Sequence, residues 1–270
     1  MDNDLKIVIE IIKKAWSILM KYYGSSNLNT KFKVDEFDPV TQADFESEKY
    51  ILEEIKKHFP DDKILSEETE NTLRDFSWRV RMIDPLDWTK DFVWWWDMSS
   101  VMIGLCVDGI PELGVVFAPI RNSLYYAQKG QWAYYISHHT TAQKIHVSNT
   151  NSIHEVTYFS KSKFSEKREI NEKIEEVFSF KNILDWGSVW TILWEIARWK
   201  AECYILTNNK WSKWDICAPQ IILEEAWGTV TDAFWEKINF LSEWIKLDTC
   251  VVATNGLIHN EIIKKTKVIF

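Results

Sequence analysis

Two amphipathic segments near the N-terminus constrain the fold most strongly, because the apolar face of each must be covered by another layer of structure. Residues 4–23 carry apolar side chains at spacings of three and four, the period of one helix face, and this segment ends near Gly24. A second segment begins after Thr41, which is suited to be an N-cap, and stops before Pro60. The sequence therefore predicts two N-terminal helices that pack on a core.

Short segments rich in apolar and β-branched residues follow these helices and predict strands. Turn residues at Gly109, Pro119 and Gly130 separate several of them. The strand-like segments are residues 63–66, 80–84, 101–107, 113–118 and 124–128. Their order predicts an antiparallel sheet after the two helices.

Strand-like and helical segments alternate from about residue 146 onward, which is typical of an α/β unit. The strand-like segments are residues 155–160, 201–206 and 250–254, and the helical ones are 167–177, 189–198, 215–225 and 257–265. We predict an α/β fold of two parts, residues 1–145 and residues 146–270. The active site is expected between them.

The charge balance argues against several classes of partner. The 270 residues include 40 acidic and 32 basic side chains, for a net charge of -8, and the pI is about 5.4. This balance argues against binding a long nucleic acid through a broad basic face. Charges interrupt the apolar residues at the N-terminus, so no secretory leader or membrane span is predicted, and a cytoplasmic location is expected. The four cysteines are far apart and predict free thiols.

The densest group of acidic side chains surrounds residues 84–89, D-P-L-D-W-T. Two carboxylates three residues apart, with a proline between them, can point at one centre and offer the hard oxygen ligands that Mg²⁺ prefers. Glu67 ends an upstream strand, and Asp215 opens a downstream helix. Taken alone, each acidic residue has a simpler interpretation as a surface charge or, for Asp215, as a helix cap.

Other catalytic motifs are absent from the sequence. The six histidines show no H-x-x-x-H or H-E-x-x-H spacing, and no serine lies in a G-x-S-x-G elbow. Glycine-rich loops for dinucleotides and the Walker lysine are also missing. The carboxylates therefore remain the main candidate for chemistry.

The order of the acidic motifs resembles the inositol monophosphatase family. The motifs are Asp44 in the second helix, the pair Glu67-Glu68, D-P-L-D-W-T at 84–89, Trp214-Asp215, and W-G followed by T-D at 227–232. The resemblance extends from the first helix to about residue 259, which is nearly the whole chain. It implies an α/β fold of alternating helix and sheet layers. It also implies a Mg²⁺-dependent hydrolase that acts on phosphate monoesters of a small substrate.

The resemblance implies a role for each matching residue, with two or three Mg²⁺ ions bound. The implied ligands are Glu67, Glu68, Asp84, the carbonyl of Leu86, Asp87 and Asp215. Asp84 would be shared by the first two ions, and Glu68 would add to a third, weaker site. Glu67 and Thr89, with Asp44 behind Thr89, would orient and deprotonate the attacking water. The backbone N–H groups of Trp88 and Thr89 would bind phosphate oxygens.

The resemblance is closer to one branch of the family. Residues 87–92, D-W-T-K-D-F, are more similar to the 3'(2'),5'-bisphosphate nucleotidases than to the inositol monophosphatases. We therefore favour adenosine 3',5'-bisphosphate as substrate, with inositol 1-phosphate or a sugar bisphosphate as alternatives. Gly187, Ser188 and Lys90 are expected near the substrate, although Lys90 is equally consistent with a solvated lysine. A homodimer is one candidate assembly.

Tryptophan occurs repeatedly where the family has glycine. The chain has 16 Trp and 8 Gly, whereas average glycine usage is about 7%. Trp88 replaces the glycine of D-G-T, and Trp227 replaces the first glycine of a Gly-Gly pair. Trp16, Trp132, Trp199 and Trp235 also fall at expected glycines, and a looser alignment adds Trp94, Trp95, Trp96, Trp190, Trp211 and Trp244. Only Trp214 matches a family tryptophan.

Such replacements are too costly to accumulate. Each one at a tight turn or packed crossing should cost roughly several kcal/mol, whereas whole proteins are stable by about 5–15 kcal/mol. We hypothesise that the gene comes from a lineage that reads UGA as glycine, and that this codon is rendered as tryptophan. A genuine Trp88 would crowd the phosphate-binding amides and leave a catalytically impaired, non-enzymatic protein. Glycine there would leave an active enzyme.

Overall fold

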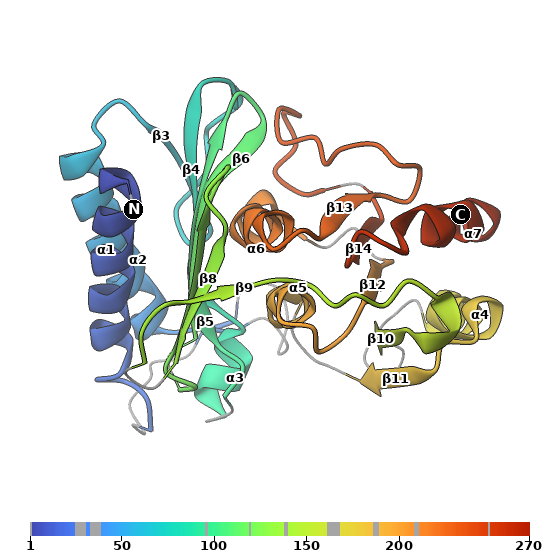
Figure 1. Ribbon diagram of the computed structural model, residues 1–270. Coiled ribbons are helices and arrows are strands. Elements are labelled where there is room, and N and C mark those ends of the chain that lie inside the picture. The colour runs from blue at the N-terminus through green and yellow to red at the C-terminus, as the bar shows by residue number, and fades with distance from the viewer. Residues whose placement is uncertain are drawn as a thin grey trace.

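The computed structural model shows helices and sheets that alternate in layers (Figure 1). It describes residues 2–24, 31–32, 39–94, 97–118, 120–137, 140–160, 168–185, 189–207, 211–247 and 249–270. The first layer consists of α1 (Asn3–Leu19) and α2 (Gln42–His58), which cover one face of a seven-stranded sheet. The predicted helices are confirmed, and Thr41 is the N-cap of α2. The predicted layered α/β fold is also confirmed.

The seven-stranded sheet follows the order of the chain. Its strands are β3 (Lys63–Ser66), β4 (Arg79–Asp87), β5 (Ser100–Val107), β6 (Ile110–Ala118), β7 (Ser123–Gln128), β8 (Ala133–Ser137) and β9 (Gln143–Ile145). The antiparallel prediction is right from β4 to β7 but wrong for β3, which runs parallel to β4. The sequence did not predict β8 and β9, which extend the sheet by antiparallel pairing. Residues 67–78 form the long connection that a parallel pair requires. Pro119, a predicted turn residue, lies outside the described residues.

Two helices separate this sheet from a second, five-stranded sheet (Figure 1). They are α5 (Val189–Ala197) and α6 (Lys213–Glu225), and α4 (Arg168–Phe178) and α7 (His259–Ile269) cover the outer side of the second sheet. The second sheet has the order β11 (Asn182–Asp185), β10 (Thr157–Ser160), β12 (Cys203–Leu206), β14 (Val251–Thr254) and β13 (Thr229–Asp232). The sequence did not predict β11 or β13, although it predicted β10, β12 and β14, which are equally short.

Short elements complete the described fold. A separate pair joins β1 (Lys31–Phe32) to β2 (Pro39–Val40), and η1 (Ile153–Glu155) is one 3₁₀ turn. The five residues of α3 (Thr89–Val93) follow β4 directly. All strands of the seven-stranded sheet precede residue 146, and all strands of the five-stranded sheet follow it. The division into residues 1–145 and 146–270 stays a prediction.

Three clusters of buried apolar side chains lie between successive layers. Ile12 and Ile51 belong to the cluster between the first helices and the seven-stranded sheet. The largest cluster joins this sheet to α5 and α6, and the third joins the five-stranded sheet to α4 and α7. Each fully buried apolar side chain contributes about 1.5–3 kcal/mol to stability, so these clusters hold the layers together.

Six of the described tryptophans adopt a backbone conformation that normally belongs to glycine. Their φ angles are 64° at Trp78, 58° at Trp88, 72° at Trp132, 61° at Trp199, 73° at Trp227 and 79° at Trp235. A left-handed conformation costs a residue with a side chain about 1–2 kcal/mol, so the six together cost roughly 6–12 kcal/mol. This is comparable to the whole stability of a typical protein, about 5–15 kcal/mol.

A buried charge network ties α1 to β4. The guanidinium of Arg81 is fully buried, and its Nε lies 2.6 Å from Asp62 Oδ2. Arg79 Nε contacts the other oxygen of Asp62 at 2.6 Å, and both arginines reach Asp4 Oδ2, at 2.8 Å and 3.2 Å. Asp62 therefore supplies the close counter-charge of a buried cation.

Removal of this counter-charge should strongly destabilise the fold. We expect Asp62→Ala to lower the free energy of unfolding by about 3–5 kcal/mol, because Arg81 would remain buried without its main partner. Urea denaturation measures the change. The control is Glu112→Ala, which breaks the more exposed pair with Lys129 and should cost at most about 1 kcal/mol. Equal losses of unfolding free energy in the two variants would contradict the claim that burial makes the Asp62 contacts more important than the exposed pair.

Candidate active site

One face of α2 carries three buried polar residues, Asp44, Ser47 and Glu48, that contact the rest of the site. Asp44 completes a capping box, and its Oδ2 accepts hydrogen bonds from Thr41 N at 2.8 Å and Thr41 Oγ1 at 2.6 Å. Its Oδ1 accepts from Thr89 Oγ1 at 2.8 Å. Burial raises the pKa of Asp44 to about 6, although these hydrogen bonds oppose the shift. The carboxylate is thus held rigidly behind Thr89.

The end of β4 supplies two carboxylates. In a regular strand, side chains three residues apart point to opposite faces, but the pairing with β5 shifts register between Asp84 and Asp87. Asp84 Oδ1 accepts a hydrogen bond from Leu86 N at 3.1 Å, and Ser47 Oγ donates to the carbonyl of Pro85 at 3.0 Å. The irregular strand end is therefore held by its own carboxylate and by α2.

The start of α6 supplies the third carboxylate. Ser212 is the N-cap of α6, and Asp215 completes its capping box, because Asp215 Oδ2 accepts a hydrogen bond from Ser212 N at 2.7 Å. The predicted capping role of Asp215 is confirmed in this form. Gly114 allows α6 to approach the sheet, because a Cβ atom there would lie 2.5 Å from the carbonyl of Ala218. Asp84, Asp87 and Asp215 each offer an oxygen, and these oxygens lie within 4.8 Å of one another. Asp215 can therefore complete the capping box of α6 and belong to the acidic cluster at the same time.

Glu48 anchors the segment that carries Glu67 and Glu68. It accepts hydrogen bonds from the Ser66 hydroxyl, from Glu68 N at 3.0 Å, and from the N–H and hydroxyl of Thr69 at 3.1 Å and 3.0 Å. The sequence reasoning missed both Glu48 and Ser47. Their signal was the spacing of three and four residues after Asp44, which places all three on one helix face.

The electrostatics of the cluster favour a cation. Burial raises the pKa of Asp84 well above its usual value, and the charges of Glu67, Asp87 and Asp215 raise it further. Asp84 Oδ2 is buried, and no group in the described part of the chain donates a hydrogen bond to it. A cation bound there would satisfy this oxygen and offset the repulsion. The residues present therefore fit a Mg²⁺ ion.

The structure describes only some of the residues that are expected near the substrate. Trp88 is the N-cap of α3 and is half-buried against the cluster between the sheet, α5 and α6. Thr89 and Lys90 form the first turn of α3, and Thr89 Oγ1 also lies 3.0 Å from the carbonyl of Leu86. Gly187 and Ser188 lie outside the described residues, as do Trp95 and Trp96. The catalytic, metal-binding and substrate-binding roles stay predictions.

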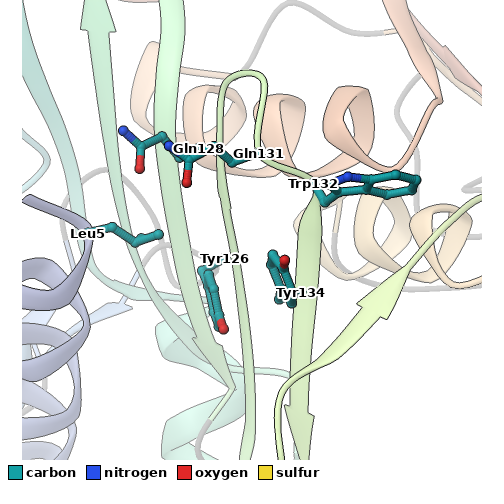
Figure 2. A pocket seen from close by; sticks show the side chains of 6 residues that line it. All are labelled: Leu5, Tyr126, Gln128, Gln131, Trp132 and Tyr134. Carbon is teal, nitrogen blue, oxygen red and sulfur yellow. The ribbon is translucent and has the colours of Figure 1, made fainter. Parts of the chain in front are cut away.

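A separate pocket of about 220 Å³ lies between α1 and the β7–β8 hairpin, where Leu5 faces Tyr126 (Figure 2). The lining residues are Leu5, Tyr126, Gln128, Gln131, Trp132 and Tyr134. They include neither a carboxylate nor a basic group to bind phosphate. This pocket is therefore a poor candidate for the active site.

Comparison with known proteins identifies the family. The profile of the inositol monophosphatase family matches residues 1–269. The chain belongs to the inositol monophosphatase family. A fructose-1,6-bisphosphatase/inositol-1-monophosphatase of Thermotoga maritima is 30% identical over 260 residues, which cover 96% of this chain and 94% of the relative. The Nus factor SuhB of Pasteurella multocida is 32% identical over 86% of each chain.

A solved structure agrees with this assignment. An IMPase of Thermotoga maritima superposes with a TM-score of 0.81 at 29% sequence identity, and the match covers 99% of this chain and 98% of the other. The family and the relatives named as phosphatases support a phosphomonoesterase, as the acidic motifs predicted. Among the described residues, no helix is both long and apolar enough to span a membrane.

The contacts of Glu48 generate a testable prediction. We expect Glu48→Ala to lower phosphate release about 10- to 100-fold and to raise the Mg²⁺ concentration needed for half-maximal activity, because the segment carrying Glu67 loses its anchor. Glu53→Ala, at an exposed position of α2, is the matched control and should retain full activity. A folded Glu48→Ala protein with unchanged rate and Mg²⁺ dependence would contradict the positioning role.

Proposed function

We propose that this phosphomonoesterase uses Mg²⁺ bound by Glu67, Asp84, Asp87 and Asp215. Two observations carry the proposal. Asp84, Asp87 and Asp215 bring oxygens within 4.8 Å of one another, and the buried Oδ2 of Asp84 accepts no hydrogen bond from the described residues. The family is generally Mg²⁺-dependent, in agreement with this donor set. We further propose two or three ions, with the Leu86 carbonyl and Glu68 as additional ligands.

The proposed chemistry assigns a task to each contact around Thr89. When bound, Mg²⁺ neutralises charge on the phosphate and on the departing ester oxygen. The Thr89 hydroxyl donates to Asp44 Oδ1, which leaves its lone pairs available to accept a hydrogen bond from the attacking water. Glu67 lies close enough to Asp44 and Asp84 for its charge to raise the pKa of both. We assign Glu67 and Thr89 to water activation, with Asp44 holding the Thr89 hydroxyl.

The first substrate candidate is adenosine 3',5'-bisphosphate. It is supported by the similarity of residues 87–92 to the bisphosphate nucleotidase branch. Lys90 lies on the first turn of α3, three residues after Asp87. We propose that its ammonium contacts a second phosphate of the substrate. We place the backbone amides at 88 and 89, together with Gly187 and Ser188, on the substrate side of the site.

Inositol 1-phosphate and a sugar bisphosphate are the alternative substrates. The name of the Thermotoga maritima relative, fructose-1,6-bisphosphatase/inositol-1-monophosphatase, favours them. Both alternatives use the same carboxylates, since members of one fold differ in the loops above a shared site. A cytoplasmic location and a homodimer are further proposals, which fractionation and light scattering would test.

The substrate proposal is tested by phosphate release from three compounds in the presence of Mg²⁺. We expect adenosine 3',5'-bisphosphate to give a higher kcat/KM than inositol 1-phosphate or fructose 1,6-bisphosphate. The protein should be made with tryptophan and with glycine at position 88. A preference for either of the other substrates would overturn the nucleotide proposal and leave the family assignment intact.

The metal proposal is tested by substitution of a carboxylate. We expect Asp87→Asn to lower the rate more than about 100-fold, beyond the loss typical for residues that only support a metal ligand. Circular dichroism should show an unchanged fold. Asp61→Asn, an exposed acidic residue, is the control and should keep the original rate. Retained activity in Asp87→Asn would contradict the assignment of the site.

A further inference from the structure

The C-terminus of α5 has the geometry of a Schellman motif with tryptophan at the position that glycine normally occupies. Lys200 N donates to the carbonyl of Glu195 at 2.9 Å, and Trp199 N donates to the carbonyl of Ile196 at 3.0 Å. These two bonds define the motif, and they require a left-handed residue between the helix and the exiting chain. Trp199 has that conformation, with φ of 61°.

The C-terminus of α6 repeats the same arrangement independently. Gly228 N donates to the carbonyl of Leu223 at 2.9 Å, and Trp227 N donates to the carbonyl of Glu224 at 2.9 Å. Trp227 occupies the left-handed position, with φ of 73°. Both helices therefore end in a motif that favours glycine because glycine has no Cβ atom to clash there.

The remaining left-handed tryptophans lie at turns and at one helix start. In the β7–β8 turn, the N–H groups of Gly130, Gln131 and Trp132 donate to the Glu225 carboxylate at 2.8–3.0 Å. Trp78 N donates to Asp108 Oδ1 at 2.7 Å just before β4. Trp235 and Trp88 complete the set. Each of these residues has a positive φ, the conformation that glycine adopts most readily.

Several of these indole rings gain little burial in return for this strain. The exposed fractions of Trp78, Trp199 and Trp227 are 57%, 64% and 61%. The Trp132 and Trp227 rings contact each other, with centroids 4.7 Å apart, and Lys144 Nζ lies 4.3 Å from the centroid of the Trp132 ring. A large apolar side chain that is both strained and exposed stabilises the fold poorly. The backbone at these positions therefore specifies glycine, although the sequence specifies tryptophan.

We propose that positions 78, 88, 132, 199, 227 and 235 are glycine in the protein that its own cell makes, because the gene encodes them with UGA codons read as glycine. Trp214 differs from these six, because it lies inside α6 and does not have a positive φ. We therefore expect a UGG codon at position 214. Positive φ thus identifies six positions at which the backbone itself favours glycine.

The proposal has a consequence at position 88, and this step rests on the proposed function. Trp88 stands between Asp87 and Thr89, at the left-handed N-cap of α3. Glycine there removes the half-buried indole, which packs against the cluster between the sheet, α5 and α6, next to the amides that we propose bind phosphate. We expect the form with glycine at the six positions to turn over substrate at least 10-fold faster than the form with tryptophan.

The proposal is tested first on the native gene and protein. We expect UGA at the six positions, UGG at 214, and tryptic peptides of the natively expressed protein with the mass of glycine at each of the six. UGG codons at these positions, or peptides with the mass of tryptophan, would overturn the proposal. Neither readout depends on the reaction that the enzyme catalyses, so a failed activity assay would count only against the proposed function.

Thermal unfolding tests the structural argument on recombinant protein. Replacing all six tryptophans with glycine should raise the Tm by more than about 10 °C, because left-handed strain is relieved at six sites. The matched control is the double variant Trp94→Gly and Trp244→Gly, since both side chains are exposed and neither residue has positive φ. The control should show no increase. An unchanged or lower Tm in the six-glycine protein would overturn the structural argument.

Discussion

Mutual repulsion among buried carboxylates is the constraint on which the site depends. Asp84 is completely buried, and three neighbouring acidic groups raise its pKa together with burial. Such a cluster is tolerable only where other groups offset its charge. Part of the compensation comes from backbone N–H groups and from the positive end of α6, where Asp215 caps the helix. A bound cation is the natural source of the remainder.

The layered architecture brings these carboxylates together from distant parts of the chain. Two come from an irregular strand end, one from the start of α6, and Glu67 follows a strand paired in parallel beside β4. The close packing of α6 on β6 requires Gly114, so the site depends on a glycine outside it. The polar face of α2 then contacts both the end of β4 and the segment after β3 that carries Glu67 and Glu68. The packing of four separate elements thus determines the positions of the carboxylates in the site.

The sequence predicted the parts of this arrangement that local patterns encode. The start of α2 at Thr41 and the opening of α6 beside Asp215 both follow from capping rules. The parallel pairing of β3 was not predictable, because it depends on a connection without a helical or strand pattern. Glu48 escaped notice because a buried glutamate with four hydrogen bonds cannot be distinguished from a solvated one by residue type. Only tertiary structure reveals its partners.

Direct measurement of Mg²⁺ binding tests the central claim that the carboxylates form a metal site. Isothermal titration calorimetry of the folded protein, without substrate, separates binding from catalysis. We predict saturable Mg²⁺ binding to the unmodified chain and loss of that binding in Asp84→Asn, because Asp84 contributes a fully buried carboxylate to the cluster. Equal Mg²⁺ affinity in the two proteins would contradict the account.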